Sequence, residues 1–100
     1  MGSRLELHNE LLKLIPNAYF QPPSNIQLIY PCIVYHKNSK DIMNANNGKY
    51  LSTQEYRLTL IEKKADSPLA DAIENSFNHC SITGYYVMDG LNHTTLNLYY

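Results

Sequence analysis

Apolar residues near the start of the chain recur every three to four positions, the spacing of a helix with one buried side. The pattern predicts a helix over Leu5–Ile15, with Ser3 as its cap. Pro16 ends it, because proline has no amide hydrogen to continue the helical bonds. The predicted apolar side consists of Leu5, Leu7, Leu11, Leu12, Leu14 and Ile15.

Residues 17–25 contain Pro22 and Pro23, which exclude a helix and favour extended backbone. We expect an extended connector whose Tyr19 and Phe20 pack against the core. A strand is predicted over Leu28–Lys37, and Pro31 favours an edge position or the start of that strand.

The segment Asn38–Lys49 is polar, rich in asparagine and contains Gly48, which predicts a long, mobile loop. Over Thr53–Lys63 apolar and polar residues alternate, which predicts a strand with one wet face. Its apolar side is formed by Tyr56, Leu58 and Leu60, and its polar side by Arg57, Thr59 and Lys63.

A second helix is predicted from Asp66-Ser67-Pro68 to about Asn78, with proline at the first helical position. Two alternating segments, Cys80–Met88 and Thr94–Tyr100, then predict a hairpin. On the first of them, Ile82, Tyr86 and Met88 are expected to share a face. The predicted fold is α+β: an antiparallel sheet of about four strands with two helices packed on it, in the order α-β-β-α-β-β.

The composition indicates one folded domain over residues 1–100, since 44% of the residues are apolar and 17% are charged. A formal net charge of -1, with scattered Lys and Arg, disfavours tight binding of nucleic acid. No apolar run approaches the roughly 20 residues of a membrane span. The start of the chain does not resemble a signal peptide, so we expect the protein to stay where it is made; Gly2-Ser3 fits a cloning remnant.

A metal centre or a catalytic nucleophile is not expected. The histidines and the cysteines lack the short paired spacing of a zinc site, and neither cysteine has a context that activates a thiol. Cys32 and Cys80 are interpreted as buried thiols, and surface or hydrogen-bonded histidines are the favoured alternative to a metal site. The histidines are His8, His36, His79 and His93.

Paired carboxylates also occur, as Glu55 with Glu62 and Asp66 with Asp71. Glu62, followed by two lysines, is interpreted as a solvated strand end, and Asp71 as a complement to the helix dipole. The glycines are isolated, so no phosphate-binding loop is predicted. We therefore expect no catalytic residue and no cofactor.

Nine tyrosines in 100 residues are the unusual feature of the composition, because tyrosine suits surfaces that are wet alone and buried when bound. The alternative is that Tyr35, Tyr56 and Tyr86 simply cover the sheet. Tyr99 and Tyr100 are expected on opposite faces of the last strand, with no chain left to cover them. One of them is expected to contact another subunit.

Several segments occur together in a characteristic order: Tyr19-Phe20-Gln21-Pro22-Pro23, Tyr30-Pro31-Cys32-Ile33-Val34-Tyr35, Tyr56-Arg57-Leu58-Thr59-Leu60-Ile61 with Asp66-Ser67-Pro68, and Leu91-Asn92-His93. From about residue 16 onward the chain resembles the tail terminator, or tail completion, proteins of long-tailed bacteriophages and prophages. It departs from them at Asn44-Ala45-Asn46-Asn47-Gly48, where the family leads us to expect a more acidic loop.

The resemblance implies a structural virion protein, made in the cytoplasm of the bacterial host, that forms a homo-oligomeric ring, usually of six copies, at the neck. Such a ring ends the tail tube, contacts the tube protein and a head-side connector protein, and lets DNA pass without binding a sequence. The alternatives are another neck or head-completion subunit, and a small enzyme or ligand-binding domain with a pocket between helix and sheet. The predicted protein interface comprises Asp41, Asn44, Asn46, Asn47, Lys49, Tyr50, Tyr99 and Tyr100.

Overall fold

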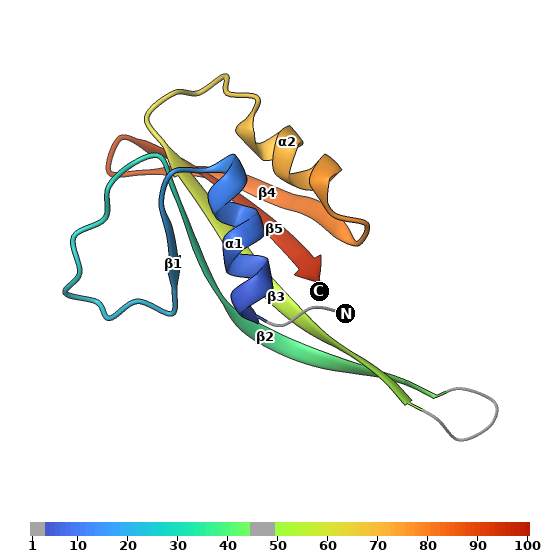
Figure 1. Ribbon diagram of the computed structural model, residues 1–100. Coiled ribbons are helices and arrows are strands. Elements are labelled where there is room, and N and C mark those ends of the chain that lie inside the picture. The colour runs from blue at the N-terminus through green and yellow to red at the C-terminus, as the bar shows by residue number, and fades with distance from the viewer. Residues whose placement is uncertain (1–3, 45–49) are drawn as a thin grey trace.

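The computed structural model describes residues 4–44 and 50–100, and for 39–44 and 50–53 it describes the backbone alone. Two helices and five strands follow one another along the chain (Figure 1). They are α1 (Arg4–Leu14), β1 (Ala18–Phe20), β2 (Cys32–Asn44), β3 (Tyr50–Glu62), α2 (Leu69–Ser76), β4 (Cys80–Met88) and β5 (Leu91–Tyr99).

The strands form one mixed sheet in the order β1-β2-β3-β5-β4. β1 is parallel to β2, whereas the β2–β3, β3–β5 and β4–β5 pairs are antiparallel. The prediction of a four-stranded antiparallel sheet in the order α-β-β-α-β-β is therefore wrong. The structure has an α+β fold with a fifth strand, β1, on the outer side of β2.

β1 was missed because the prolines around it indicate only extended backbone, and extended backbone also forms strands. Its bonds to β2 are those of a short parallel ladder, with the Ile33 amide donating to the Asn17 carbonyl and the Gln21 amide donating to the Tyr35 carbonyl, each at 2.9 Å. β2 consequently has a neighbour on both sides over Ile33–Tyr35, whereas beyond Tyr35 it pairs only with β3 in the described sheet. It begins at Cys32, directly after Pro31, four residues later than predicted.

The predicted long loop over Asn38–Lys49 is also wrong, because most of it is strand. β2 continues to Asn44 and β3 starts at Tyr50, with paired backbone up to the Asn44–Tyr50 pair. The register shifts between Lys37 and Ser39, which marks a bulge where the polar sequence begins. The two strands extend as a hairpin beyond the body of the domain (Figure 1). The longest extent of the whole molecule is 51 Å.

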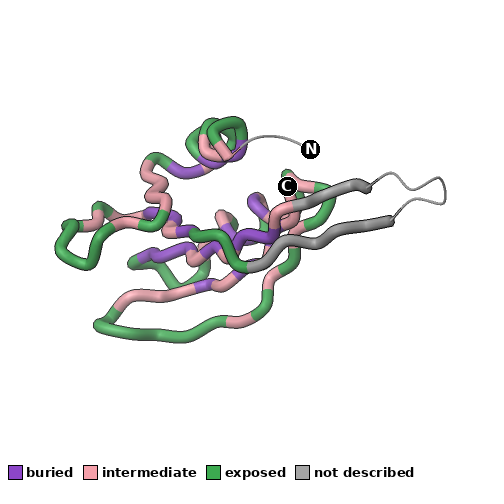
Figure 2. The backbone as a smooth tube through the Cα atoms, turned by 90° about the horizontal axis from the view of Figure 1, so that it is seen from below, coloured by how far each residue is buried: buried purple, intermediate pink, exposed green. Residues whose placement is uncertain are grey.

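Both helices lie on one face of the sheet, and the core lies between them and the strands (Figures 1 and 2). α1 contributes Leu7 and Leu11 to the core, and Ile15 follows its end. The prediction that Leu5 and Leu12 widen this buried side is wrong, because they are 64% and 43% exposed. The sheet contributes alternate residues, as the two-residue period requires. The buried core comprises Leu7, Leu11, Ile15, Ile33, Tyr35, Tyr56, Leu58, Leu60, Ala70, Ile73, Leu96 and Leu98.

β4 and β5 form the predicted hairpin, but its turn is tighter than expected. Asp89 and Gly90 have φ values of 55° and 73°, so the two-residue turn has positive φ at both positions, as a type I′ turn requires. A register shift between Ile82 and Gly84 adds a residue to β4. Ile82 therefore packs against the core while Tyr86 lies on the opposite face, and the expectation that they share a face is wrong.

Candidate functional site

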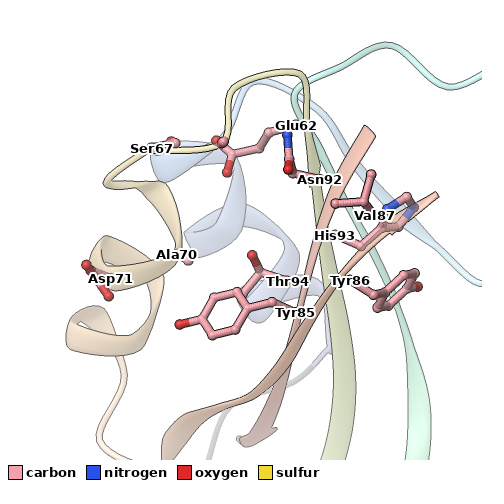
Figure 3. A pocket seen from close by; sticks show the side chains of 11 residues that line it. Glu62, Ser67, Ala70, Asp71, Tyr85, Tyr86, Val87, Asn92, His93 and Thr94 are labelled. Carbon is pink, nitrogen blue, oxygen red and sulfur yellow. The ribbon is translucent and has the colours of Figure 1, made fainter. Parts of the chain in front are cut away.

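A pocket of about 310 Å³ lies between the start of α2 and the ends of β3, β5 and β4 (Figure 3). Its floor follows from the strand register. Glu62 of β3 pairs with Asn92 of β5, and Asn92 pairs with Val87 of β4, so these residues form one row across the sheet. The next row holds Thr94 and its β4 partner Tyr85.

α2 forms the opposite wall of the pocket, through Ser67, which precedes the helix, and Ala70 and Asp71. The helix begins after Pro68, which provides no side-chain cap, and the Ser67 hydroxyl instead accepts a bond of 3.2 Å from the Leu69 amide. The predicted helix start was thus one residue early, and the predicted end at about Asn78 was two residues late, since α2 ends at Ser76.

Glu62 is the unusual member of this pocket, because its residue is only 7% exposed. The prediction that it forms a solvated strand end is wrong. Figure 3 shows its side chain reaching from β3 toward the segment that leads into α2. Among residues 4–44 and 50–100, no hydrogen bond or ion pair to its carboxylate is found.

A signal in the sequence could have identified Glu62. The buried stripe of β3 runs through Tyr56, Leu58 and Leu60, and the two-residue period places Glu62 next on the same face. The two lysines that follow suggested exposure instead. Strand parity, rather than the charge of the neighbours, determines which face a side chain occupies.

The pocket walls carry the Glu62 carboxylate, the hydroxyls of Tyr85 and Thr94, and the imidazole of His93. Asp71 belongs to the α2 wall, and its side chain points away from Glu62 (Figure 3). None of the described residues that line the pocket is a lysine or an arginine. The site therefore offers oxygen acceptors, which suit a positively charged ligand with N–H donors.

β4 forms one border of the pocket and is also an edge of the sheet. Toward its end, four consecutive large side chains are strongly exposed, which leaves an apolar and aromatic surface along an unpaired strand edge. Tyr86 stacks on His93 on the face away from the helices, with ring centroids 4.6 Å apart (Figure 3). The exposed fractions are 72% for Tyr85, 44% for Tyr86, 69% for Val87 and 54% for Met88.

The predicted interface residues fall into separate groups. Asp41 and Asn44 belong to β2 and Tyr50 to β3, all in the extended hairpin rather than in a loop, and only their backbone is described. Asn46, Asn47 and Lys49 lie outside the described residues.

Tyr99 and Tyr100 lie at the end of β5, and both are partly buried. Tyr100 packs against the core, with its ring edge-on to Phe77 at 6.0 Å, and its amide donates to the Gln54 carbonyl at 3.1 Å. The expectation that no part of the chain covers these rings is therefore wrong for Tyr100. Of the tyrosines expected to cover the sheet, Tyr35 and Tyr56 are core residues and Tyr86 is exposed.

The thiols show no sign of activation. Burial raises the pKa of the Cys32 thiol from 9.0 to about 11, and burial, helped by the Glu74 carboxylate, does the same for Cys80. Cys32 is buried as predicted, whereas Cys80 is only partly buried. A thiol with a raised pKa is a poor nucleophile near neutral pH.

His8 and His93 take part in local contacts. His8 Nδ1 lies 2.6 Å from the Tyr35 hydroxyl, and His93 Nδ1 lies 3.1 Å from the Leu91 carbonyl oxygen. Within the described part of the chain, no group of three or more His, Cys, Asp or Glu residues is arranged to hold a metal ion.

No protein-family model, curated protein or solved structure matches the chain. None of the helices in the described ranges is long and apolar enough to span a membrane. The fold and the site thus rest on the geometry described above.

Proposed function

We propose that the chain is a structural subunit of a bacteriophage neck, a ring-forming protein at the head-proximal end of the tail that ends the tail tube and joins it to the head. In this proposal the protein is made in the cytoplasm of the bacterial host and becomes part of the virion. The phage assignment is supported by the resemblance of residues 16–100 to tail terminator proteins.

The observation that carries the proposal is the exposure of large apolar side chains in separate places on one small domain. Besides Tyr85–Met88 on β4, Leu5 and Leu12 are exposed on α1, and Ile26 and Ile29 in the segment between β1 and β2. A protein that works alone rarely exposes such surfaces, because each one favours association. A subunit with several neighbours needs several of them.

A closed ring needs two different contact surfaces on every copy, because each copy meets its neighbours head to tail. Separate apolar surfaces on one chain meet that requirement. The β2–β3 hairpin, which extends beyond the body of the domain, adds a means to reach an adjacent protein. The proposed partners are further copies of the chain, the tail tube protein and a head-side connector protein.

The near-neutral charge also fits a passage for DNA. A formal net charge of -1 provides no excess of cations to hold the phosphate backbone, so DNA moving through the ring would be bound weakly and without regard to sequence. Another neck or head-completion subunit would need similar surfaces and is the nearest alternative.

The pocket favours a second candidate, a ligand-binding domain. Its volume of about 310 Å³ falls at the lower end of the range for small-molecule sites, roughly 300–1,000 Å³. Unlike most such sites, however, it is bordered by a strongly exposed strand edge, which is more typical of a surface that another protein covers.

Light scattering and electron microscopy of the purified full chain test the ring. We expect a mass of several copies, with six as the leading number, and ring-shaped particles. Ile29→Lys and Met88→Lys, at positions 63% and 54% exposed, each place a charge on one apolar surface, and at least one of them should lower the assembled fraction at least tenfold. Asn75→Lys, at an exposed polar position on α2, is the matched control.

A chain that stays monomeric at all concentrations, both alone and with purified tail tubes, would refute the ring. Assembly that both lysine variants leave unchanged would show that the apolar surfaces do not carry it. Antibody labelling of virions then separates the neck assignments, because a tail terminator must be found on isolated tails and a head-completion protein on isolated heads.

A further inference from the structure

The Glu62 carboxylate is buried, and the described residues supply no hydrogen bond or ion pair to it. The residue is 7% exposed, and no hydrogen bond or ion pair to the carboxylate is found within residues 4–44 and 50–100. Removing a carboxylate from water is costly unless hydrogen bonds or an opposite charge replace the lost solvation. Glu55, equally buried on the same strand, has such a partner in Asn38 at 3.0 Å.

The start of α2 supplies only part of the missing stabilisation. The positive end of a helix dipole favours a nearby carboxylate by about 0.3–1 kcal/mol. The Leu69 amide, however, donates to the Ser67 hydroxyl rather than to Glu62. The carboxylate thus lies close to a weakly favourable field and still lacks a donor.

The pocket around Glu62 is complementary to an organic cation. The Thr94 and Tyr85 hydroxyls and the Asn92 amide oxygen supply further acceptors. The Asn92 amide nitrogen donates to the Lys63 carbonyl at 3.4 Å, which leaves its oxygen available. A guanidinium or ammonium group brings several N–H donors and a charge opposite to that of Glu62.

The position of the pocket beside β4 indicates which kind of molecule carries the cation. Tyr85 and Val87 line the pocket and also belong to the edge strand β4, on the face covered by the helices. A polypeptide strand added to that edge would project alternate side chains toward the same face. The side chain opposite this end of β4 would then lie over the pocket.

The β1 and β4 strands of a second copy do not provide the cation, because neither Ala18–Phe20 nor Cys80–Met88 contains a lysine or an arginine. Pairing of β4 with either of these strands would leave Glu62 unmatched. Beyond Tyr35 the outer side of β2 is also unpaired in the described sheet and carries Lys37 and Lys40. We take a basic segment of a different protein as the occupant, and the self-association readout below tests the β2 edge of a second copy.

We propose that β4 and the Glu62 pocket together bind an extended segment of another protein, with a lysine or arginine side chain inserted between α2 and the sheet. The inference deepens the proposed function and rests on it, because it specifies the chemistry of one partner of the assembly: a basic strand that extends the sheet beyond β4.

Peptide binding to the isolated, ¹⁵N-labelled full chain tests this directly. The probe is a blocked heptapeptide of alternating threonine and valine with a central arginine, and its control carries citrulline, which has nearly the same shape without the charge. We expect the arginine peptide to bind at least tenfold more tightly. The amide resonances of Tyr85, Val87 and Asn92 should shift most.

A double-mutant cycle assigns the charge to its partner. Glu62→Gln should weaken the arginine peptide to the level of the citrulline peptide and leave citrulline binding unchanged, because two changes that remove one interaction do not add. Asp66→Asn removes one negative charge from the exposed segment before α2, outside the pocket lining, and is the matched control. It should alter arginine-peptide binding less than twofold.

Each opposing outcome has a definite meaning. Equal binding of the two peptides would refute the cation site. Methylguanidinium that binds as tightly as the peptide would show a site for a free cation, and pocket resonances that shift on self-association alone would show a second copy as occupant; either result overturns the proposal. Rings that form without peptide binding would refute this inference only, whereas peptide binding by a permanently monomeric chain would refute the ring only.

Discussion

Glu55 and Glu62 lie near the two ends of the same paired stretch of β3, each 7% exposed, yet their surroundings differ. Glu55 lies on the face away from the helices and accepts a hydrogen bond from Asn38 Nδ2 at 3.0 Å. Glu62 lies on the helix face, in an open pocket, and no such bond to it is found in the described part of the chain. The Glu55 carboxylate thus has a hydrogen-bond donor within the domain, whereas none is found for Glu62 in the described part of the chain.

The sheet around each residue explains the difference. Near Glu55 the bulge between Lys37 and Ser39 brings the Asn38 side chain against β3. Near Glu62 the neighbouring strands β5 and β4 approach their turn, and α2 begins at a distance that leaves a cavity. Burial alone therefore does not distinguish a structural carboxylate from one in a binding site; the presence of an internal donor does.

The largest effect on stability is expected from a substitution at Leu58, which lies between Glu55 and Glu62 on β3. This side chain is fully buried, and Leu58→Ala should lower the free energy of unfolding by about 2–5 kcal/mol through lost burial and a cavity. Urea unfolding measures the change. Thr59→Ala, on the opposite face, is the control and should cost well under half as much.

That experiment also tests whether the two ends belong to one cooperative unit. If they do, fluorescence and circular dichroism should give coincident transitions in the variant. Separate transitions would show that the Glu62 end unfolds on its own and that the contrast between the glutamates reflects two independent regions.

The two thiols extend the comparison, since Cys32 pairs with Ile61 beside Glu62, while Cys80 pairs with Leu98 toward the Glu55 end. Burial raises the pKa of both thiols from 9.0 to about 11. The unfolded chain releases these protons near pH 9, and the folded chain retains them until about pH 11. The folded state thus binds more protons in this window, and its stability must fall as the pH rises.

Between pH 9 and pH 10 each thiol should remove about 1 kcal/mol from the free energy of unfolding. Replacing both cysteines with alanine should flatten this part of the pH profile, and each single replacement should remove about half of the slope. Burial also raises the pKa of Tyr35 and Tyr56, but from 10.0, so their contribution falls mainly above this window. A slope that survives the double replacement would contradict the assignment.

The sequence predicted those parts of the fold where one periodicity extends over many residues. The alternation through Tyr56, Leu58 and Leu60 located the central strand, and the spacing of Leu7 and Leu11 located α1. β1 was missed because a three-residue strand between prolines has no period of its own, and a parallel pair is fixed by its neighbour rather than by its own sequence.

The hairpin and the pocket were missed for other physical reasons. Asparagine and glycine favour turns, but backbone pairing between β2 and β3 overrides that preference as far as Asn44 and Tyr50. The bulge at Thr83, between Ile82 and Gly84, reverses the face of the β4 residues that follow it, and nothing in the alternation before it signals that change. The position of Tyr85 in the pocket was therefore not predicted.

The smallest and most specific effect on the free energy of unfolding is expected when each of the two glutamates is replaced by glutamine. Glu55→Gln keeps an oxygen for Asn38 but replaces a charge-assisted hydrogen bond with a neutral one, which should cost about 1 kcal/mol. Glu62→Gln removes a buried charge without a detected internal partner and should leave the free energy of unfolding unchanged or raise it by up to about 1 kcal/mol. Urea unfolding at pH 7 gives both values. Opposite signs at pH 7 would establish that only Glu55 is satisfied within the domain. A loss at Glu62 as large as that at Glu55 would mean that its charge is already stabilised internally, and the case for an external cation would then fail.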